Sequence, residues 1–111
     1  MAWKKILGAK ALENAGNSLS VRIDNDTVVF IARVDGKLYA MNGICTHLRC
    51  ILGKVTEDKK HVRCPCHLAE FELETGKMVK PPYIAPDSPM EKLGLKTYNI
   101  KEEDGFLQID Y

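Results

Sequence analysis

All four cysteines and two of the three histidines of this 111-residue chain lie in two short segments. The first segment is Cys45-Thr46-His47-Leu48-Arg49-Cys50, and the second is Cys64-Pro65-Cys66-His67. Thiolate and imidazole are the side chains that bind soft and borderline metals. Two loops that each carry a cysteine and a histidine can clasp one metal centre from both sides. The fold must therefore hold two such loops next to each other.

The remainder of the chain predicts an all-β fold of short antiparallel strands, arranged as a small sandwich. Val28 to Val34 is strongly apolar and β-branched, which indicates a central strand. Asp35-Gly36 and Asp104-Gly105 are hairpin signals, because glycine tolerates the positive φ of a tight turn. The other predicted strands cover residues 19–23, 37–41, 61–63, 71–73, 77–79, 95–100 and 106–109.

Helix is scarce in this sequence. Lys10 to Asn14 predicts a turn or two of helix, and Ser88-Pro89-Met90-Glu91 has the form of a capping box with proline at the first helical position. We predict a single helical turn there, inside a proline-marked loop. Trp3 is predicted to anchor the core, and His61 is interpreted as an exposed strand residue rather than a ligand.

Length and charge bound the classes of protein that fit. With 111 residues, 45% of them hydrophobic, the chain is expected to form one domain over residues 1–111. A formal net charge of +1 argues against nucleic acid as a partner, since phosphate backbones select strongly basic faces. No apolar run approaches the roughly 20 residues of a membrane helix. We expect a cytoplasmic monomer without a membrane anchor.

The spacing of the metal-binding residues indicates redox chemistry. The pattern is Cys-x-His, sixteen intervening residues, then Cys-x-x-His. Thiolates stabilise ferric iron and hold iron–sulfur clusters, whereas neutral imidazoles leave the cluster less negative. A less negative cluster accepts an electron more readily. One iron bound by sulfur and one bound by nitrogen would therefore give a cluster of raised reduction potential.

In these two motifs the chain resembles the Rieske iron–sulfur family, and more weakly it does so over most of its length. The resemblance implies a β-sandwich with a small cluster-binding subdomain and one [2Fe–2S] cluster. Cys45 and Cys64 would ligate one iron, and His47 and His67 the other. The cluster-binding loops would span about residues 43–52 and 62–70, with a proline-rich cover loop at about 80–94.

The two remaining cysteines and the cover loop follow from the same resemblance. Cys50 and Cys66 occupy the positions at which high-potential Rieske proteins have a disulfide between the two loops. A soluble protein with this pair resembles the unanchored Rieske proteins of thermophilic archaea. Pro81 and Pro82 would stiffen the cover. The apolar side chains expected around the histidine edges are those of Leu48, Leu68 and Pro82.

Several residues depart from the high-potential branch of the family. Ala69 and Phe71 stand where that branch has a serine and a tyrosine whose hydroxyls donate hydrogen bonds to the cluster sulfurs. Without these donors the potential should be lower. We predict a value between dioxygenase-type ferredoxins and the high-potential branch. Leu68 and Arg49 replace glycines, so the backbone geometry of both loops is left open.

Other chemistries use the same residue types. Two cysteines and two histidines also bind structural zinc, four cysteines also form two plain disulfides, and a cysteine beside His47 or His67 is a possible nucleophile. None of these uses the whole pattern. The cluster domain leaves no sequence for a second cofactor, so we expect an electron carrier with no substrate chemistry. Its partners would be a redox donor and an acceptor. The alternative is a small non-catalytic subunit of a dioxygenase or nitrite reductase system.

Overall fold

The computed structural model describes residues 3–25, 27–44, 51, 54–66, 68–84, 86–87 and 89–110. Strands dominate this part of the chain, in agreement with the predicted all-β class. The elements are β1 (Trp3–Gly8), α1 (Ala9–Asn14), β2 (Ser18–Arg22), β3 (Val28–Val34), β4 (Lys37–Asn42), β5 (Lys54–Val55), β6 (His61–Arg63), β7 (Glu70–Glu72), β8 (Met78–Lys80), the 3-10 turn η1 (Met90–Lys92), β9 (Thr97–Glu103) and β10 (Phe106–Asp110).

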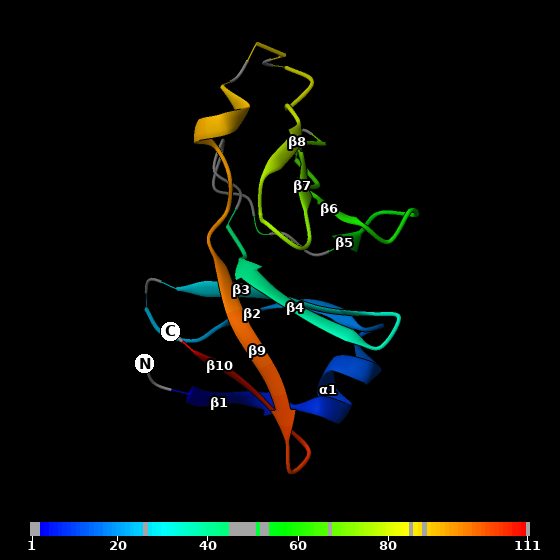
Figure 1. Ribbon diagram of the computed structural model, residues 1–111, viewed down its shortest axis with the longest axis vertical. Coiled ribbons are helices and arrows are strands. Elements are labelled where there is room, and N and C mark those ends of the chain that lie inside the picture. Colours follow the sequence, from blue (N-terminus) through cyan, green and yellow to red (C-terminus); the bar gives the residue numbers. More distant parts are fainter. Residues whose placement is uncertain are drawn as a thin grey trace.

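In the described residues the strands form two antiparallel sheets. The large sheet has the order β1-β10-β9-β4-β3-β2, and the small sheet has the order β5-β6-β7-β8. Figure 1 shows the small sheet and the following segment at one end of the elongated molecule, and β1, β10 and α1 at the other. The small sheet is built entirely from chain that lies between β4 and β9, so it is an insertion into the large sheet.

Strand β3 is the centre of the fold, as its apolar sequence predicts. Residues 28–32 are buried, and successive side chains of a strand point to opposite faces. Phe30 and Ala32 pack into a core with the small sheet, together with Val62 and Phe71. On its other face β3 contributes to a second core, inside the large sheet. That second core consists of Leu12, Val29, Ile31, Ala40, Leu107 and Ile109.

Both predicted Asp-Gly hairpins are confirmed. Asp35 and Gly36 have φ of 52° and 82°, and Val34 pairs with Lys37 directly across the turn. Asp104 and Gly105 repeat this geometry with φ of 54° and 80° between β9 and β10. Positive φ at both central residues gives the turn a twist that matches the strands. These local signals set the register of β3 with β4 and of β9 with β10.

The small sheet joins the large one through a neck formed by Asn42, Gly43, Leu95 and Lys96. The Asn42 amide donates to the Lys96 carbonyl (2.8 Å), and the Leu95 amide donates to the Gly76 carbonyl (2.7 Å). Gly76 has φ of +77°, and a Cβ built on it would lie 2.0 Å from the Leu95 carbonyl oxygen. No side chain fits there, so the turn after β7 can pack against the returning chain only with glycine.

Trp3 was predicted to be a core residue, and this is wrong. It lies on β1, which the sequence did not predict, and 41% of its surface is exposed. The Lys101 Nζ lies 4.4 Å from the centre of the indole ring. A lysine stem and its ammonium group can cover an aromatic face at the surface, so the ring needs no place in the core.

Two predicted elements change in extent. The last predicted strand pair begins at Thr97 instead of Leu95, because Leu95 is buried in the neck against the small sheet. The helical turn near Pro89 is confirmed as η1, but Pro89 is its N-cap residue and not, as predicted, its first helical residue. Ser88, the predicted cap, lies outside the described residues. Among the described helices, none has the length and apolar character required to span a membrane.

Candidate metal centre

Cys64 is the predicted ligand that lies in the described part of the chain. It directly follows β6, its side chain is fully buried, and its thiol is free. It packs in the core shared by the two sheets, with Ala69 and Phe71. Cys45, His47 and His67 lie outside the described residues. A free buried thiol at the end of a strand is held by rigid structure and can act as a metal ligand.

The second predicted loop is closed by its own backbone. The Cys64 amide donates to the Ala69 carbonyl (2.8 Å), and the Leu68 amide donates to the Cys64 carbonyl (3.0 Å). These bonds hold the ends of β6 and β7 together, so the segment between them is a tight loop. Pro65 has no N–H to contribute. The closure keeps Cys64 fixed relative to the sheet.

Leu68 resolves the question that the sequence left open at this loop. Its φ is +61°, the left-handed conformation that glycine adopts most readily, and 43% of its surface is exposed. The backbone therefore keeps the conformation expected for glycine, although a leucine occupies the position. Left-handed backbone costs an ordinary residue about 1–2 kcal/mol, which the two closing hydrogen bonds help to offset.

The ends of the first predicted loop are also held together. Ile44 and Ile51 form an isolated antiparallel bridge, and Asn42 Oδ1 accepts a hydrogen bond from the Ile44 amide (3.1 Å). Gly43 donates to the Val28 carbonyl (2.7 Å), and a Cβ on Gly43 would lie 2.9 Å from a methyl group of Val28. The chain thus leaves the large sheet on a fixed path. Leu48, Arg49 and Cys50 lie outside the described residues, as do the ligands predicted in this loop.

The residues predicted to surround the cluster divide into buried and exposed ones. Ala69, Phe71 and Pro82 are buried, and Pro81 is half-buried. The side chains of Ala69 and Phe71 bring no hydrogen-bond donor into this region. Next to Pro82, the exposed apolar side chains are those of Tyr83 and Ile84.

Cys64 keeps a free thiol. The disulfide that the resemblance implies joins Cys66 to Cys50, and Cys50 lies outside the described residues, so this pairing stays a prediction. The division of roles in the second motif, in which Cys64 binds metal and Cys66 does not, stays a prediction with it.

An ion-pair triad lies across the end of the small sheet that carries the second loop. The Glu70 Oε2 atom lies 3.1 Å from Arg63 Nη2 and 3.9 Å from Lys80 Nζ. Arg63 directly precedes Cys64, and Glu70 directly follows Ala69. The Arg63–Glu70 ion pair therefore joins the two ends of the loop. The carboxylate side chain is largely covered, at 13% exposure, whereas both cations are well exposed.

A second polar cluster stabilises the turn between β5 and β6. Asp58 accepts hydrogen bonds from the Thr56 hydroxyl (2.5 Å) and the Lys60 amide (2.9 Å), and its other oxygen lies 2.8 Å from His61 Nδ1. The Thr56 hydrogen bond, followed by that of Lys60, lowers the pKa of Asp58 to about 2. His61 is a strand residue as predicted, but it is half-buried rather than exposed.

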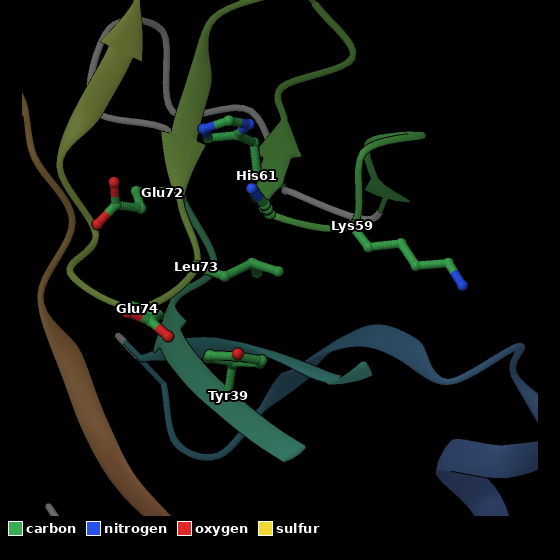
Figure 2. A pocket seen from close by; sticks show the side chains of 7 residues that line it. Tyr39, Lys59, His61, Glu72, Leu73 and Glu74 are labelled. Atoms are coloured by element: carbon green, nitrogen blue, oxygen red, sulfur yellow. The ribbon is translucent and has the colours of Figure 1, made fainter. Parts of the chain in front are cut away.

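His61 also lines a pocket of about 320 Å³ between the sheets. Figure 2 shows Tyr39 of β4 on one side and Leu73, Glu74 and His61 of the small sheet on the other, with Lys59 extending away from them. Within the described residues no group of three or more metal-binding side chains is found here or elsewhere. The pocket carries mixed charge, and among the described residues none of the predicted ligands lines it.

The donor chemistry fits an iron–sulfur cluster. The free, buried Cys64 supplies a sulfur ligand in an apolar setting, and the backbone closures present both predicted loops from rigid strands. An apolar shell around a metal site limits the access of solvent to it. The sequence missed the triad and the neck, because both depend on cross-strand register rather than on a motif.

Comparison with known proteins gives consistent matches. The model of the Rieske [2Fe-2S] domain family matches residues 2–99. Sulredoxin from Sulfurisphaera tokodaii is 57% identical over 110 residues, which cover 99% of both chains. The ferredoxin subunit of 3-phenylpropionate/cinnamic acid dioxygenase from Escherichia coli K12 is 35% identical over 92 residues, covering 82% of this chain and 79% of that one.

Solved structures share the fold. The ferredoxin of carbazole 1,9a-dioxygenase from Nocardioides aromaticivorans IC177 superposes with a TM-score of 0.75 at 18% identity, covering 98% of this chain and 97% of that one. A 2-oxoquinoline 8-monooxygenase component gives a TM-score of 0.79 at 26% identity. The match covers 96% of this chain but spans only 25% of the monooxygenase component.

Proposed function

Since the chain belongs to the Rieske [2Fe–2S] family, we propose that Cys45 and Cys64 ligate one iron of its cluster and that His47 and His67 ligate the other. The observation that carries this assignment is the free, fully buried thiol of Cys64 at the closed end of β6. The protein is a Rieske-type electron-transfer protein with one [2Fe–2S] cluster. When bound, the cluster takes up and releases one electron at a time.

The residues of this chain have three tasks in that function. Cys64 and the closed loop that follows it fix a sulfur ligand, the buried Pro82 and the core around Phe71 exclude water, and the imidazoles hold protons at their free nitrogens. We propose that the chain performs no substrate chemistry. Free-standing exchange of electrons between proteins is supported by the full-length similarity to sulredoxin.

A second role is supported by a separate relative. The Escherichia coli ferredoxin subunit serves a dioxygenase by its name, and it is 35% identical to this chain. In this second role the chain is one component of an oxygenase system, with the oxygenase as electron acceptor. Size-exclusion chromatography of native extract separates the two roles, because a free cytoplasmic monomer elutes alone and a subunit elutes with its complex.

We also propose that Cys66 forms a disulfide with Cys50. The bridge would close a loop of about 17 residues and, on a chain-entropy account, would stabilise the fold by about 3 kcal/mol. Non-reducing peptide mapping identifies the partner directly. A Cys66 peptide linked to Cys45 instead would contradict both the bridge and the assignment of Cys45 as a ligand.

Histidine ligation has a consequence for the reduction potential. Iron(III) withdraws electron density from imidazole, so the free N–H of each ligand should be more acidic in the oxidised protein. Reduction then becomes coupled to proton uptake, and the potential should fall as the pH rises through the neutral-to-alkaline range. Protein-film voltammetry measures this dependence. A potential that stays constant from about pH 6 to about pH 11 would exclude the two histidines as ligands.

The missing hydroxyls should hold the potential at an intermediate value. The Ala69 and Phe71 side chains are buried and carry no donor. We expect Phe71→Tyr to raise the potential by adding a hydrogen-bond donor beside the cluster, because such bonds favour the reduced, more negative form. Phe71→Leu serves as the control, since it alters packing without adding a donor. Equal potentials for the two variants would contradict this explanation.

A further inference from the structure

The Arg63–Glu70–Lys80 triad forms an exposed cationic face beside the second cluster loop. All the ion pairs of the triad converge on one oxygen of Glu70: Arg63 Nε and Nη2 lie 3.1 Å from it, and Lys80 Nζ lies 3.9 Å from it. Two cations therefore share one carboxylate, which leaves a net positive charge at this position.

The exposure of the three side chains places that charge at the surface. The Glu70 side chain is 13% exposed, against 44% for Arg63 and 58% for Lys80. The negative group is thus covered by its partners, and the positive groups face solvent. In the alternation of β6 and β7, the neighbours Val62 and Phe71 point into the core, so the triad lies on the outer face of the small sheet.

The position of the triad links it to electron transfer. Arg63 precedes Cys64, Glu70 follows the same loop, and Lys80 precedes the half-buried Pro81 and the buried Pro82 of the cover segment. Figure 1 shows this end of the small sheet at the tip of the molecule, away from β1 and β10. Exposed apolar side chains are also found here, those of Leu68, Tyr83 and Ile84.

Two carboxylates accompany this face. Glu72 lies on the same face of β7, but it is half-buried, accepts a hydrogen bond from the Thr75 hydroxyl (2.9 Å) and pairs with His61 at the end of the strand away from the loop. Asp87 is an exposed carboxylate of the proline-rich segment. The positive charge is therefore confined to the ends of β6 and β8 that adjoin the loop. Charges of one sign around an apolar patch attract a partner of the opposite sign and orient it before contact.

We propose that the Arg63–Glu70–Lys80 face docks an acidic surface of the protein that exchanges electrons with this chain. The proposal rests on the electron-transfer function and adds the charge of the partner. The exposed cations would steer an acidic polypeptide to the second cluster loop, with Leu68 in contact once the encounter complex forms. One electron then passes between the cluster and the partner, and no covalent bond is made or broken.

Stopped-flow oxidation of the reduced holoprotein tests this proposal with probes of known charge. Ferricyanide is the anionic oxidant and tris(phenanthroline)cobalt(III) is the cationic one; each takes one electron. Lys80→Gln keeps the Arg63–Glu70 pair and lowers the charge of the face, whereas Glu70→Gln raises it. Lys10→Gln, on α1 at the other end of the molecule, makes the same change in net charge as Lys80→Gln and is the matched control.

We expect Lys80→Gln to slow ferricyanide at low salt by about threefold or more, and Glu70→Gln to accelerate it, with opposite effects on the cobalt complex. Lys10→Gln should leave both rates near those of the wild type. Poly-L-glutamate, as an acidic polypeptide, should compete with ferricyanide in the wild type and less in Lys80→Gln. These effects should shrink as ionic strength rises.

Two negative results are distinguishable. If the purified protein lacks iron and acid-labile sulfide, the electron-transfer function fails and the docking proposal fails with it. If the cluster is present with an unchanged spectrum, but Lys80→Gln and Glu70→Gln behave like Lys10→Gln with both oxidants, only the docking proposal is overturned.

Discussion

The two sheets of this protein are stabilised in different ways. The large sheet has strands of five to seven residues, local Asp-Gly hairpins and a core of its own. The small sheet has strands of two or three residues, and its core includes Phe30 and Met41 of the large sheet. Short strands make few hydrogen bonds, so the small sheet depends more on the apolar contacts that the large sheet provides. The cluster end of the molecule therefore depends on its neighbours and on the cluster.

Removal of the cluster should affect the two sheets unequally, and this is the largest effect that we expect. Cys64→Ser removes a predicted ligand from the core, and the cluster should be lost. Amide hydrogen exchange should then accelerate strongly in β6 and β7, while β3 and β10 keep most of their protection. Uniform loss of protection across both sheets would show that they fold as one unit. It would contradict the claim that the two sheets are stabilised in different ways.

The neck gives the next largest effect. Gly76→Ala would place a methyl group 2.0 Å from the Leu95 carbonyl oxygen, so the turn after β7 has to move away from the returning chain. We expect a loss of about 3 kcal/mol or more in the free energy of unfolding. Chemical denaturation of the holoprotein measures it.

Gly36→Ala is the matched control for the neck. Gly36 has a similar φ of +82°, but nothing lies within 4 Å of its added Cβ. Only the cost of the left-handed backbone remains, about 1 kcal/mol. Equal destabilisation by the two substitutions would mean that backbone conformation alone, and not contact with Leu95, explains the need for glycine at Gly76.

The turn between β5 and β6 should stay folded in acid until the pH is very low. The folded-state pKa of Asp58, about 2, lies below its ordinary value of 3.8. The ionised carboxylate therefore stabilises the turn fully above about pH 4, and this contribution is lost as the pH falls through about 2. The protection of the Lys60 amide, which is its exchange rate relative to the intrinsic rate at each pH, should follow that titration. Asp58→Asn should remove this change in protection, and an Asp58→Asn protein that still shows it would contradict the assignment.

The smallest effect is expected at Leu68. Leu68→Gly relieves a left-handed backbone that costs about 1 kcal/mol, but glycine also makes the unfolded chain more flexible by a similar amount. The melting temperature should change little. Leu68→Val introduces a β-branched side chain, which tolerates positive φ poorly, and should lower it. If valine proves as stable as glycine here, the loop does not hold the conformation described.

Much of the large sheet could be predicted because its signals are local. The apolar run of β3 and the two Asp-Gly turns determine strands and register within a few residues. Strand β1 escaped prediction because Trp3, Lys4 and Lys5 show no clean alternation, and its pairing partner β10 lies at the other end of the chain. The exposure of Trp3 depends on Lys101, a contact that the sequence does not reveal.

The candidate site likewise combines features that a local motif predicts with features that depend on contacts between distant segments. Motif spacing was sufficient to predict the family, because metal chemistry restricts the residue types directly; the ligand set that it implies stays a prediction. The left-handed backbone of Leu68 and the glycine requirement at the neck depend on how distant segments pack, and no local pattern encodes them. The ion-pair triad likewise arises from the register of β6, β7 and β8.

The central claim is that one [2Fe–2S] cluster is bound by two cysteines and two histidines. The most direct test is iron and acid-labile sulfide analysis of the purified protein, combined with electron paramagnetic resonance of its reduced form. We predict about two irons and two sulfides per chain, with the low average g value that histidine ligation produces. Zinc in place of iron, absence of labile sulfide, or a spectrum unchanged by His67→Ala would contradict the account.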